Sequence, residues 1–173
     1  MRKNNQGFTL LELIIIVAII AVVSGLAAVS LAPILNTAAK QAAVSAKAKI
    51  YQCKTDCMAK NADVTCLEFK NDDGYLVATY YQGDLTEAVS SEKLANRKVT
   101  LTYGGTKLED GEKLYLDFEK SSGSVRHFGV AGDVSSASVA GSSTNCTLTM
   151  AAGATTYELR LDPVSGVCKL KRQ

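Results

Sequence analysis

Residues 7–23 read Gly-Phe-Thr-Leu-Leu-Glu-Leu-Ile-Ile-Ile-Val-Ala-Ile-Ile-Ala-Val-Val, an apolar run that carries a single carboxylate, Glu12. No further charged residue occurs before Lys40. A helix over this stretch would extend roughly 40 Å, which exceeds the roughly 30 Å of a bilayer core, so the segment is predicted to be able to span a membrane. A glutamate in lipid costs on the order of 2 to 3 kcal/mol, so Glu12 is expected to have a cationic partner.

A short basic leader with Arg2 and Lys3 precedes Gly7-Phe8-Thr9-Leu10-Leu11-Glu12. This arrangement resembles the prepilin processing motif of type IV pilins and pseudopilins, over approximately residues 1–35. The resemblance implies that a membrane aspartyl peptidase cuts after Gly7 and methylates the new amino terminus at Phe8. It also implies that Glu12 pairs with the Phe8 amine of a neighbouring subunit during assembly. Two buried opposite charges offset each other when they are hydrogen-bonded, which agrees with that pairing.

Two other interpretations explain parts of this segment. An ordinary secretory signal peptide would use Arg2 and Lys3 as its basic region and residues 13–23 as its apolar region, with cleavage near the small residues of 25–30. A plain membrane anchor would be oriented with its amino terminus inside by the same two basic residues. A secretory apolar region rarely begins with a carboxylate, and a plain anchor leaves Glu12 unexplained, so the pilin interpretation is favoured.

The length of the chain predicts one domain on a stalk. The predicted class is α+β, with a long amino-terminal α-helix packed on an antiparallel β-sheet head that is similar to the heads of pilins. The predicted divisions, in chain order, are a leader (1–7), a transmembrane and filament-core half of the helix (8–33) and a globular head (34–173). Within the head we expect the second half of the helix (34–60), an αβ region (61–97) and a β-sheet (98–173).

Small and apolar residues recur at spacings of three and four along the second half of the predicted helix. These positions are Leu35, Ala38, Ala42, Ala46, Ile50, Cys53 and Cys57. Such spacings place side chains on one face of a helix. This face is therefore predicted to pack on the head.

After Asn61 the apolar residues recur at about every second position, and turn residues become frequent. This pattern predicts strands joined by hairpins. Strands at 64–70 and 75–81 flank a hairpin turn at 71–74. A helix is predicted at 84–96, because Asp84 three residues before Glu87 resembles a capping box. Further strands are predicted at 98–103, 113–119, 124–130 and 157–161, and the Ser-, Gly- and Ala-rich segment 131–145 is predicted to be an exposed loop.

The five cysteines are Cys53, Cys57, Cys66, Cys146 and Cys168. An exported head would lie in a compartment that permits disulfides, and we expect Cys146 to pair with Cys168 because their strands flank the hairpin at 157–161. Cys53 and Cys57 lie one helical turn apart, which does not favour a bridge between them, and Cys66 is expected to be able to pair with either. Buried unpaired thiols are the alternative. Spacings among Cys53, Cys57 and Cys66 match no standard zinc site, so no metal is predicted.

Catalytic and nucleic-acid-binding functions find little support in the composition and motifs. The single histidine, His127, lies in a predicted strand and is interpreted as an exposed strand residue, and the sequence lacks hydrolase, phosphate-binding and metalloprotease motifs. The turn at 71–74 lacks the ligand pattern of a calcium loop. There are 19 basic and 17 acidic side chains, and loss of Arg2 and Lys3 with a leader makes them equal, so nucleic acid is not indicated as a partner. We predict no enzyme activity and no cofactor.

The predicted function is a structural subunit of a type IV pilus-like filament. The resemblance implies as partners other pilin subunits, a prepilin peptidase, membrane lipid before assembly and a membrane assembly platform with a motor ATPase. It implies a single-pass precursor in the cytoplasmic membrane with its amino terminus inside, and then an extracellular or periplasmic filament. A minor pilin, a pseudopilin of a secretion or DNA-uptake system, or a membrane-anchored surface binding protein is the alternative.

Overall fold

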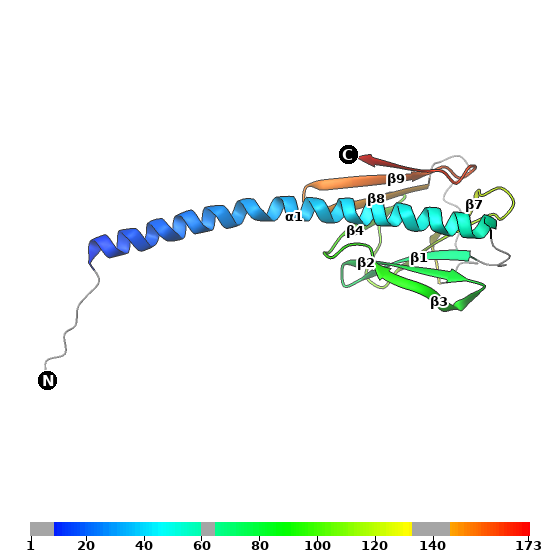
Figure 1. Ribbon diagram of the computed structural model, residues 1–173, viewed down its shortest axis with the longest axis horizontal. Coiled ribbons are helices and arrows are strands. Elements are labelled where there is room, and N and C mark those ends of the chain that lie inside the picture. Colours follow the sequence, from blue (N-terminus) through cyan, green and yellow to red (C-terminus); the bar gives the residue numbers. More distant parts are fainter. Residues whose placement is uncertain (1–8, 60–64, 133–145) are drawn as a thin grey trace, which may run out of the picture. The chain divides into compact units, whose positions relative to one another are not determined.

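The computed structural model describes residues 9–59, 65–132 and 146–173, with the side chains of 26–35 and 84 excepted (Figure 1). The chain divides into two compact units, Met1–Ile34 and Leu35–Gln173. Its one helix among the described residues, α1, spans Leu10–Ala59 and contributes to both units. In the described residues of the second unit, ten β-strands follow.

Thr9 starts α1 as its N-cap. Its Oγ1 accepts a hydrogen bond from the backbone N–H of Glu12 at 3.3 Å, and its carbonyl accepts one from the N–H of Leu13 at 3.2 Å. These bonds satisfy donors that a helix start otherwise leaves without partners. The helix that carries the apolar run therefore begins immediately after the predicted cleavage position.

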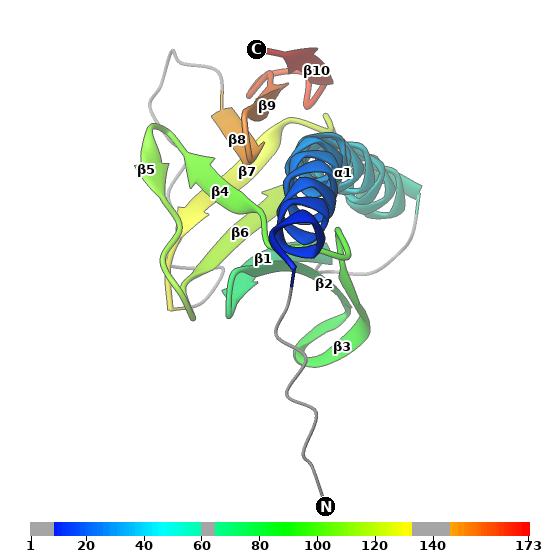
Figure 2. The same cartoon turned by 90° about the vertical axis from the view of Figure 1, so that its left-hand side faces the viewer.

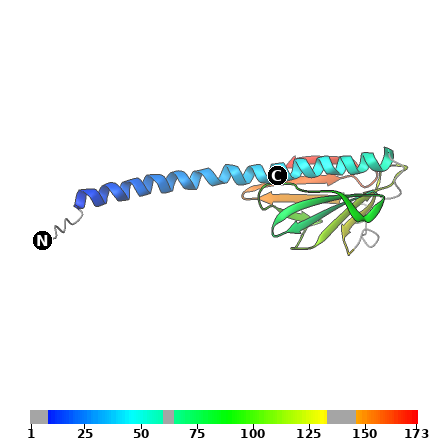
Figure 3. The same cartoon turned by 60° about the horizontal axis from the view of Figure 1, so that its bottom comes forward.

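The second half of α1 packs on the head through small residues. Ala39, Ala42, Ala43 and Ala46 are fully buried, and Ile50, Cys53 and Cys57 continue the same face. This confirms the predicted stripe at the positions whose side chains are described. Alanines let the helix axis approach the strands closely, and Figures 1 and 3 show this half of α1 running along the sheets.

The strands form two five-stranded antiparallel sheets. Sheet A has the order β3-β2-β1-β6-β7, with β1 Thr65–Asp72, β2 Tyr75–Gln82, β3 Asp84–Lys93, β6 Lys113–Phe118 and β7 Val125–Val130. Sheet B has the order β10-β9-β8-β4-β5, with β4 Thr100–Tyr103, β5 Thr106–Lys107, β8 Cys146–Ala152, β9 Thr155–Leu161 and β10 Cys168–Arg172. Figure 2 shows the helix beside the two sheets, with β3 and β10 on either side of it.

The inner faces of both sheets and the buried face of α1 form one hydrophobic core. Its largest fully buried side chains include Phe69, Phe118 and Phe128 from sheet A and Leu148 from sheet B. Each such side chain contributes about 1.5 to 3 kcal/mol when it is removed from water. Tyr103 of sheet B meets Phe128 edge to face at 6.1 Å between ring centroids, which joins the two sheets directly.

The hairpin predicted around residues 71–74 is confirmed. β1 and β2 pair from Asp72 opposite Tyr75, and the two turn residues Asp73 and Gly74 have φ values of 50° and 78°. Two successive positive φ angles match the right-handed twist of the flanking strands. The strands predicted at 98–103, 113–119, 124–130 and 157–161 correspond to β4, β6, β7 and β9.

The helix predicted at 84–96 is wrong, because this segment forms the edge strand β3. Gly83, with φ of 84°, is the only residue between β2 and β3, so the chain turns back at once and pairs with β2. Thr79 and Ser91 then meet across the strands at 3.0 Å between their hydroxyl oxygens. Leu85 and Val89 of this strand are 37% and 59% exposed.

The α+β class is confirmed by α1 and the two antiparallel sheets. Within the part of the chain that the structure describes, no helix combines the length and the hydropathy needed to cross a membrane. The transmembrane role of residues 8–33 therefore stays a prediction. The loop predicted at 131–145 lies almost entirely outside the described residues.

Candidate functional site

The predicted processing residues Gly7 and Phe8 lie outside the described residues, whereas Glu12 lies in the first turn of α1. Its carboxylate is near the positive end of the helix dipole, which favours an acidic group there. Glu12 is exposed, and the sequence offers no other charge until Lys40. A cation that pairs with Glu12 inside an apolar environment must therefore come from the amino terminus or from another molecule.

The first turns of α1 present apolar side chains to all sides. Ile14, Ile15, Ile16 and Val17 are consecutive, and successive helical residues are about 100° apart, so these four cover the whole circumference. Their side chains are between 44% and 57% exposed. Seven further apolar residues of this part of α1 are 57% to 80% exposed, namely Leu10, Leu11, Leu13, Ile19, Ile20, Val22 and Val23. A helix that is apolar all round is stable only when lipid or protein covers it.

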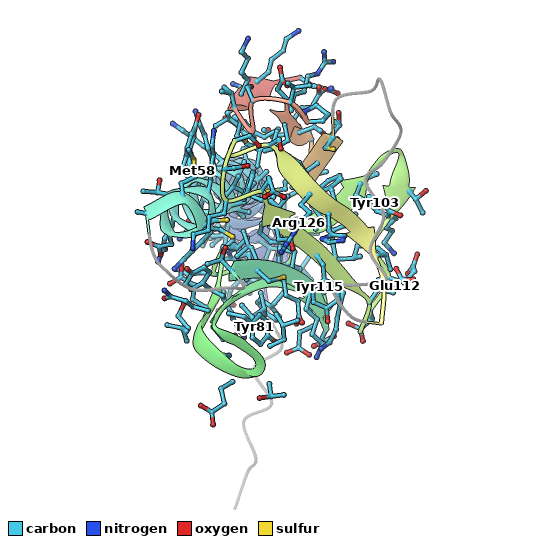
Figure 4. All side chains as sticks on the ribbon, turned by 90° about the vertical axis from the view of Figure 1, so that its right-hand side faces the viewer. Met58, Tyr81, Tyr103, Glu112, Tyr115 and Arg126 are labelled. Atoms are coloured by element: carbon cyan, nitrogen blue, oxygen red, sulfur yellow. The ribbon has the colours of Figure 1, made fainter. Side chains whose placement is uncertain are left out.

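A cluster of polar side chains, separate from Glu12, lies on the outer face of sheet A, which is the face turned away from α1. Asp117 is fully buried there, and its carboxylate accepts hydrogen bonds from Arg126 Nη2 at 2.8 Å and from the His127 backbone N–H at 2.9 Å. His127 Nδ1 lies 3.0 Å from the same carboxylate. A register shift between β6 and β7 at this point lets two consecutive β7 residues reach one residue of β6 (Figure 4 labels Arg126).

Glu68 forms the other half of this outer cluster. It is 4% exposed, and its carboxylate lies 3.2 Å from Lys113 Nζ and 3.3 Å from the Tyr81 hydroxyl. Burial, followed by the neighbouring Glu68 carboxylate, raises the pKa of both Tyr81 and Tyr115. Figure 4 labels Tyr81, Tyr115 and Arg126 on the ribbon of the head. The charged groups and hydroxyls of the cluster come from β1, β2, β6 and β7, and their contacts hold these four strands together.

Within the described part of the chain, the outer cluster offers no activated nucleophile. Burial, and then the nearby Asp117 charge, raises the pKa of the Cys66 thiol to about 12, so it stays protonated at neutral pH. Among the described residues, the hydrogen bonds of the His127 ring go to the Asp117 carboxylate. The sequence interpretation treated His127 as an exposed strand residue and missed Asp117. Alternation along β6 indicates only that Asp117 faces away from the core, and no sequence signal indicates that the outer face is also buried.

All five cysteines are buried, and none of them forms a disulfide in this structure. Cys146 and Cys168 both lie opposite Leu161, one on each side of β9. Their Cα atoms are therefore two inter-strand spacings apart, roughly 9.6 Å. A disulfide requires Cα atoms within roughly 7 Å of each other. The expected pair is therefore not formed, because the hairpin strand that suggested it lies between its members.

The remaining thiols also act as packing residues. Cys57 Sγ donates a hydrogen bond to the Phe118 carbonyl at 3.0 Å, and Cys53 belongs to the core beside it. Burial raises the pKa of Cys53 strongly and that of Cys168 to about 11. Among the described residues, no group of three or more cysteine, histidine or carboxylate side chains is arranged to hold a metal ion.

Comparison with known proteins gives one result. A family model described as the prokaryotic N-terminal methylation motif matches residues 2–28. The chain carries the type IV pilin and pseudopilin signature. No curated protein and no solved structure matches the chain, so the likeness of its head to pilin heads stays a prediction.

The pilin signature covers the three residues to which the sequence assigned processing or assembly roles, namely Gly7, Phe8 and Glu12. It implies a membrane-anchored precursor that a prepilin peptidase cleaves and methylates, and assembly with other pilins at the surface. It belongs to a structural rather than a catalytic family. The exposed apolar part of α1, which carries Glu12, is therefore the candidate functional site.

Proposed function

We propose that this protein is a structural subunit of a type IV pilus-like filament that assembles through the apolar first part of α1. The observation that carries the proposal is the exposure of this part on all sides, from Leu10 at 80% to Val23 at 59%, with Glu12 as its single charge. Such a surface is covered by lipid in a precursor and by neighbouring helices in a filament. The head then remains outside the bundle.

Processing creates the cationic partner that Glu12 requires. Cleavage after Gly7 would leave a positively charged amine on Phe8, four residues before Glu12. In a bundle of staggered helices, the carboxylate of one subunit neutralises the amine of a neighbour. Leaving one charge of such a buried pair without its partner costs about 3 to 5 kcal/mol, so the pair selects the register in which every carboxylate meets an amine.

Assembly requires external work. In lipid the apolar side chains of α1 already lie in an apolar environment, so packing them on other helices gains little free energy until the subunit leaves the membrane. A motor ATPase acting through a membrane platform supplies this work in the proposed function. Arg2 and Lys3 hold the unprocessed amino terminus on the cytoplasmic side, where the motor acts.

Mass spectrometry of the mature amino terminus tests the first step of this proposal. The expected product begins at an N-methylated Phe8, and Gly7→Val is expected to leave the leader attached because a branched side chain blocks the peptidase. A mature terminus beyond Val23 would establish a secretory signal peptide instead. An intact Met1 in cells with an active prepilin peptidase would establish a plain anchor.

A further inference from the structure

The head carries exposed basic residues at the end where α1 enters it. Lys40 is the first charged residue after Glu12, and its side chain is exposed. The first unit ends at Ile34, about 9 Å of helix before Lys40. Lys40 therefore lies close to the end of the apolar segment, whatever the angle between the two units.

β10 brings two more basic residues to this end of the head. The Tyr51 hydroxyl donates to the Cys168 carbonyl at 3.2 Å, so β10 starts beside Tyr51 of α1. Figures 1 and 3 show that β10 then runs back along α1, towards the start of the head. The strand from Cys168 to Arg172 covers about 13 Å, which equals about nine residues of helix. Arg172 therefore lies level with the part of α1 around Lys40.

Lys171 and Arg172 are both exposed at the end of β10. Neighbouring strand residues point to opposite faces of a sheet, so basic groups lie on both faces of this edge. In the described part of the chain, no ion pair ties Lys40, Lys171 or Arg172 to a carboxylate. We call these three residues the basic patch.

The turn between β8 and β9 lies at the same end of the head, because Arg172 pairs with Tyr157 near the start of β9. Its exposed residues, Gly153 and Ala154, are uncharged. One cleft joins this turn to the β1–β2 turn, since Gly153 and Asp73 both line it. Both turns therefore belong to the end that carries the basic patch.

The carboxylates near this end have partners within the head. Asp73 lies 2.9 Å from Lys98 Nζ, and Asp72 lies 3.5 Å from Lys70 Nζ. Glu158 of β9 is 3% exposed and is paired with Arg160. The basic patch is therefore the part of this end whose charge remains available to another molecule.

An anionic membrane surface matches these observations. Anionic phospholipid headgroups attract basic residues within about one Debye length, which is about 8 to 10 Å at moderate salt. The stretch of helix between the apolar segment and Lys40 has about this length. Long lysine and arginine side chains then reach the phosphates while their backbone stays above the lipid.

We propose that the basic patch docks on anionic phospholipid headgroups and holds this end of the head against the membrane surface before assembly. The proposal rests on the proposed function, because only a membrane-inserted precursor brings the head to lipid. It assigns to the end of β10 a role in the precursor rather than in the filament. Extraction of the subunit into a filament then breaks these contacts.

Fluorescence quenching of the full-length protein in vesicles tests the contact. Because the five native cysteines are buried, an introduced thiol is labelled selectively. The test probe is a small fluorophore at Ala154→Cys, beside the basic patch. The control probe is at Val164→Cys, which is 81% exposed and follows the other end of β9.

The vesicles consist of phosphatidylcholine alone, or of phosphatidylcholine with phosphatidylglycerol. Both kinds carry a small fraction of lipid with a nitroxide on its headgroup, which quenches fluorophores that touch the membrane surface. The nitroxide is present in both leaflets, so the direction of insertion does not affect the reading.

The probe at position 154 is expected to be quenched at least threefold more in the anionic vesicles than in the neutral ones, whereas the probe at position 164 is quenched equally in both. High salt should remove the difference, because it screens the attraction. Equal quenching at position 154 in both kinds of vesicle would overturn the proposal. So would an equal rise at both positions.

Charge variants identify the residues responsible. Lys40→Gln combined with Arg172→Gln should reduce the lipid-dependent difference at position 154 at least threefold, whereas Lys40→Arg combined with Arg172→Lys should preserve it. Lys54→Gln combined with Lys120→Gln removes the same net charge elsewhere on the head and should preserve it as well. Urea midpoints equal to that of the parent protein show that each head is folded. An equal loss from both glutamine pairs would contradict a role for the basic patch.

The same vesicles separate this proposal from the proposed function. A chain that inserts into both kinds of vesicle without a difference in quenching removes the lipid contact alone. A chain that enters neither kind contradicts the membrane-anchored precursor and the contact together.

Discussion

Asp117 and Arg126 form a two-pronged ion pair across neighbouring strands, with Arg126 Nη2 at 2.8 Å from Oδ2 and Nε at 3.3 Å from Oδ1. The carboxylate is fully buried, whereas the arginine side chain is 40% exposed. The pair therefore contributes to stability chiefly by keeping a buried charge satisfied. This relationship lies outside the helical site and serves the head alone.

We expect Asp117→Ala to destabilise the head by about 3 kcal/mol, because it leaves the His127 backbone N–H and Arg126 without their acceptor. Arg126→Lys should cost less, about 1 to 2 kcal/mol, since lysine cannot make both contacts. Urea unfolding of the full chain in detergent micelles, followed by tyrosine fluorescence, measures both. Lys107→Ala, which breaks an exposed ion pair with Glu109, is the control and should cost under about 1 kcal/mol. Equal effects of Asp117→Ala and Lys107→Ala would contradict this role for Asp117.

Gly166→Ala is expected to destabilise the head more than Gly105→Ala. Both glycines have positive φ, 61° and 91°, so both substitutions strain the backbone by about 1 kcal/mol or more. A Cβ at Gly166 would also lie 2.1 Å from the Gly123 carbonyl oxygen, whereas one at Gly105 would meet nothing within 4 Å. The urea midpoints of the two variants isolate this clash. Similar midpoints would show that the two turns do not pack as closely as described.

Reductant is expected to leave the unfolding midpoint of the protein unchanged, because the structure joins none of the five cysteines in a disulfide. A thiol reagent should label none of them in the folded head and all five in urea. The result that would contradict the structure is fewer than five reactive thiols in urea without reductant. Peptide mapping would then identify the bridged pair.

The environment of Glu158 in sheet B is expected to make the stability of the head fall at acidic pH. The hydrogen bond from Arg160 lowers the pKa of Glu158 below its ordinary value of 4.5, so folding favours the ionised carboxylate. This stabilisation is present above the ordinary pKa and is lost as pH falls through the lowered folded value. Glu158→Gln should therefore reduce the difference between urea midpoints at pH 7 and at pH 3. An unchanged difference would show that other carboxylates cause the acid sensitivity.

The sequence predicted best where one physical pattern acts alone. Ala42, Ala46 and Ile50 follow a helical spacing and are buried as expected. The β1–β2 hairpin was predictable because Asp73-Gly74 satisfies an unusual backbone requirement between two clear strands. In each case local geometry and burial favour the same structure.

The sequence-based predictions were wrong where the pairing of strands, rather than local sequence, determines the structure. Asp84 and Glu87 imitate the start of a helix, but the one-residue turn at Gly83 places this segment beside β2, and pairing overrides the local preference. The cysteine expectation failed for a related reason, since nearness along the chain did not reveal that β9 lies between Cys146 and Cys168. The buried outer cluster around Asp117 required knowledge of four strands at once.

The yield of sheared surface filaments from Glu12→Ala cells tests the central claim most directly. Cleavage and membrane insertion should persist, since the change removes a charge that costs about 2 to 3 kcal/mol in lipid. Filaments should fall at least tenfold, because the neighbour's amine would lose a partner at a cost of about 3 to 5 kcal/mol. Glu12→Asp should give an intermediate yield, and Glu109→Ala, an exposed head glutamate, should give a normal one. Normal filaments from Glu12→Ala would contradict assembly through this carboxylate.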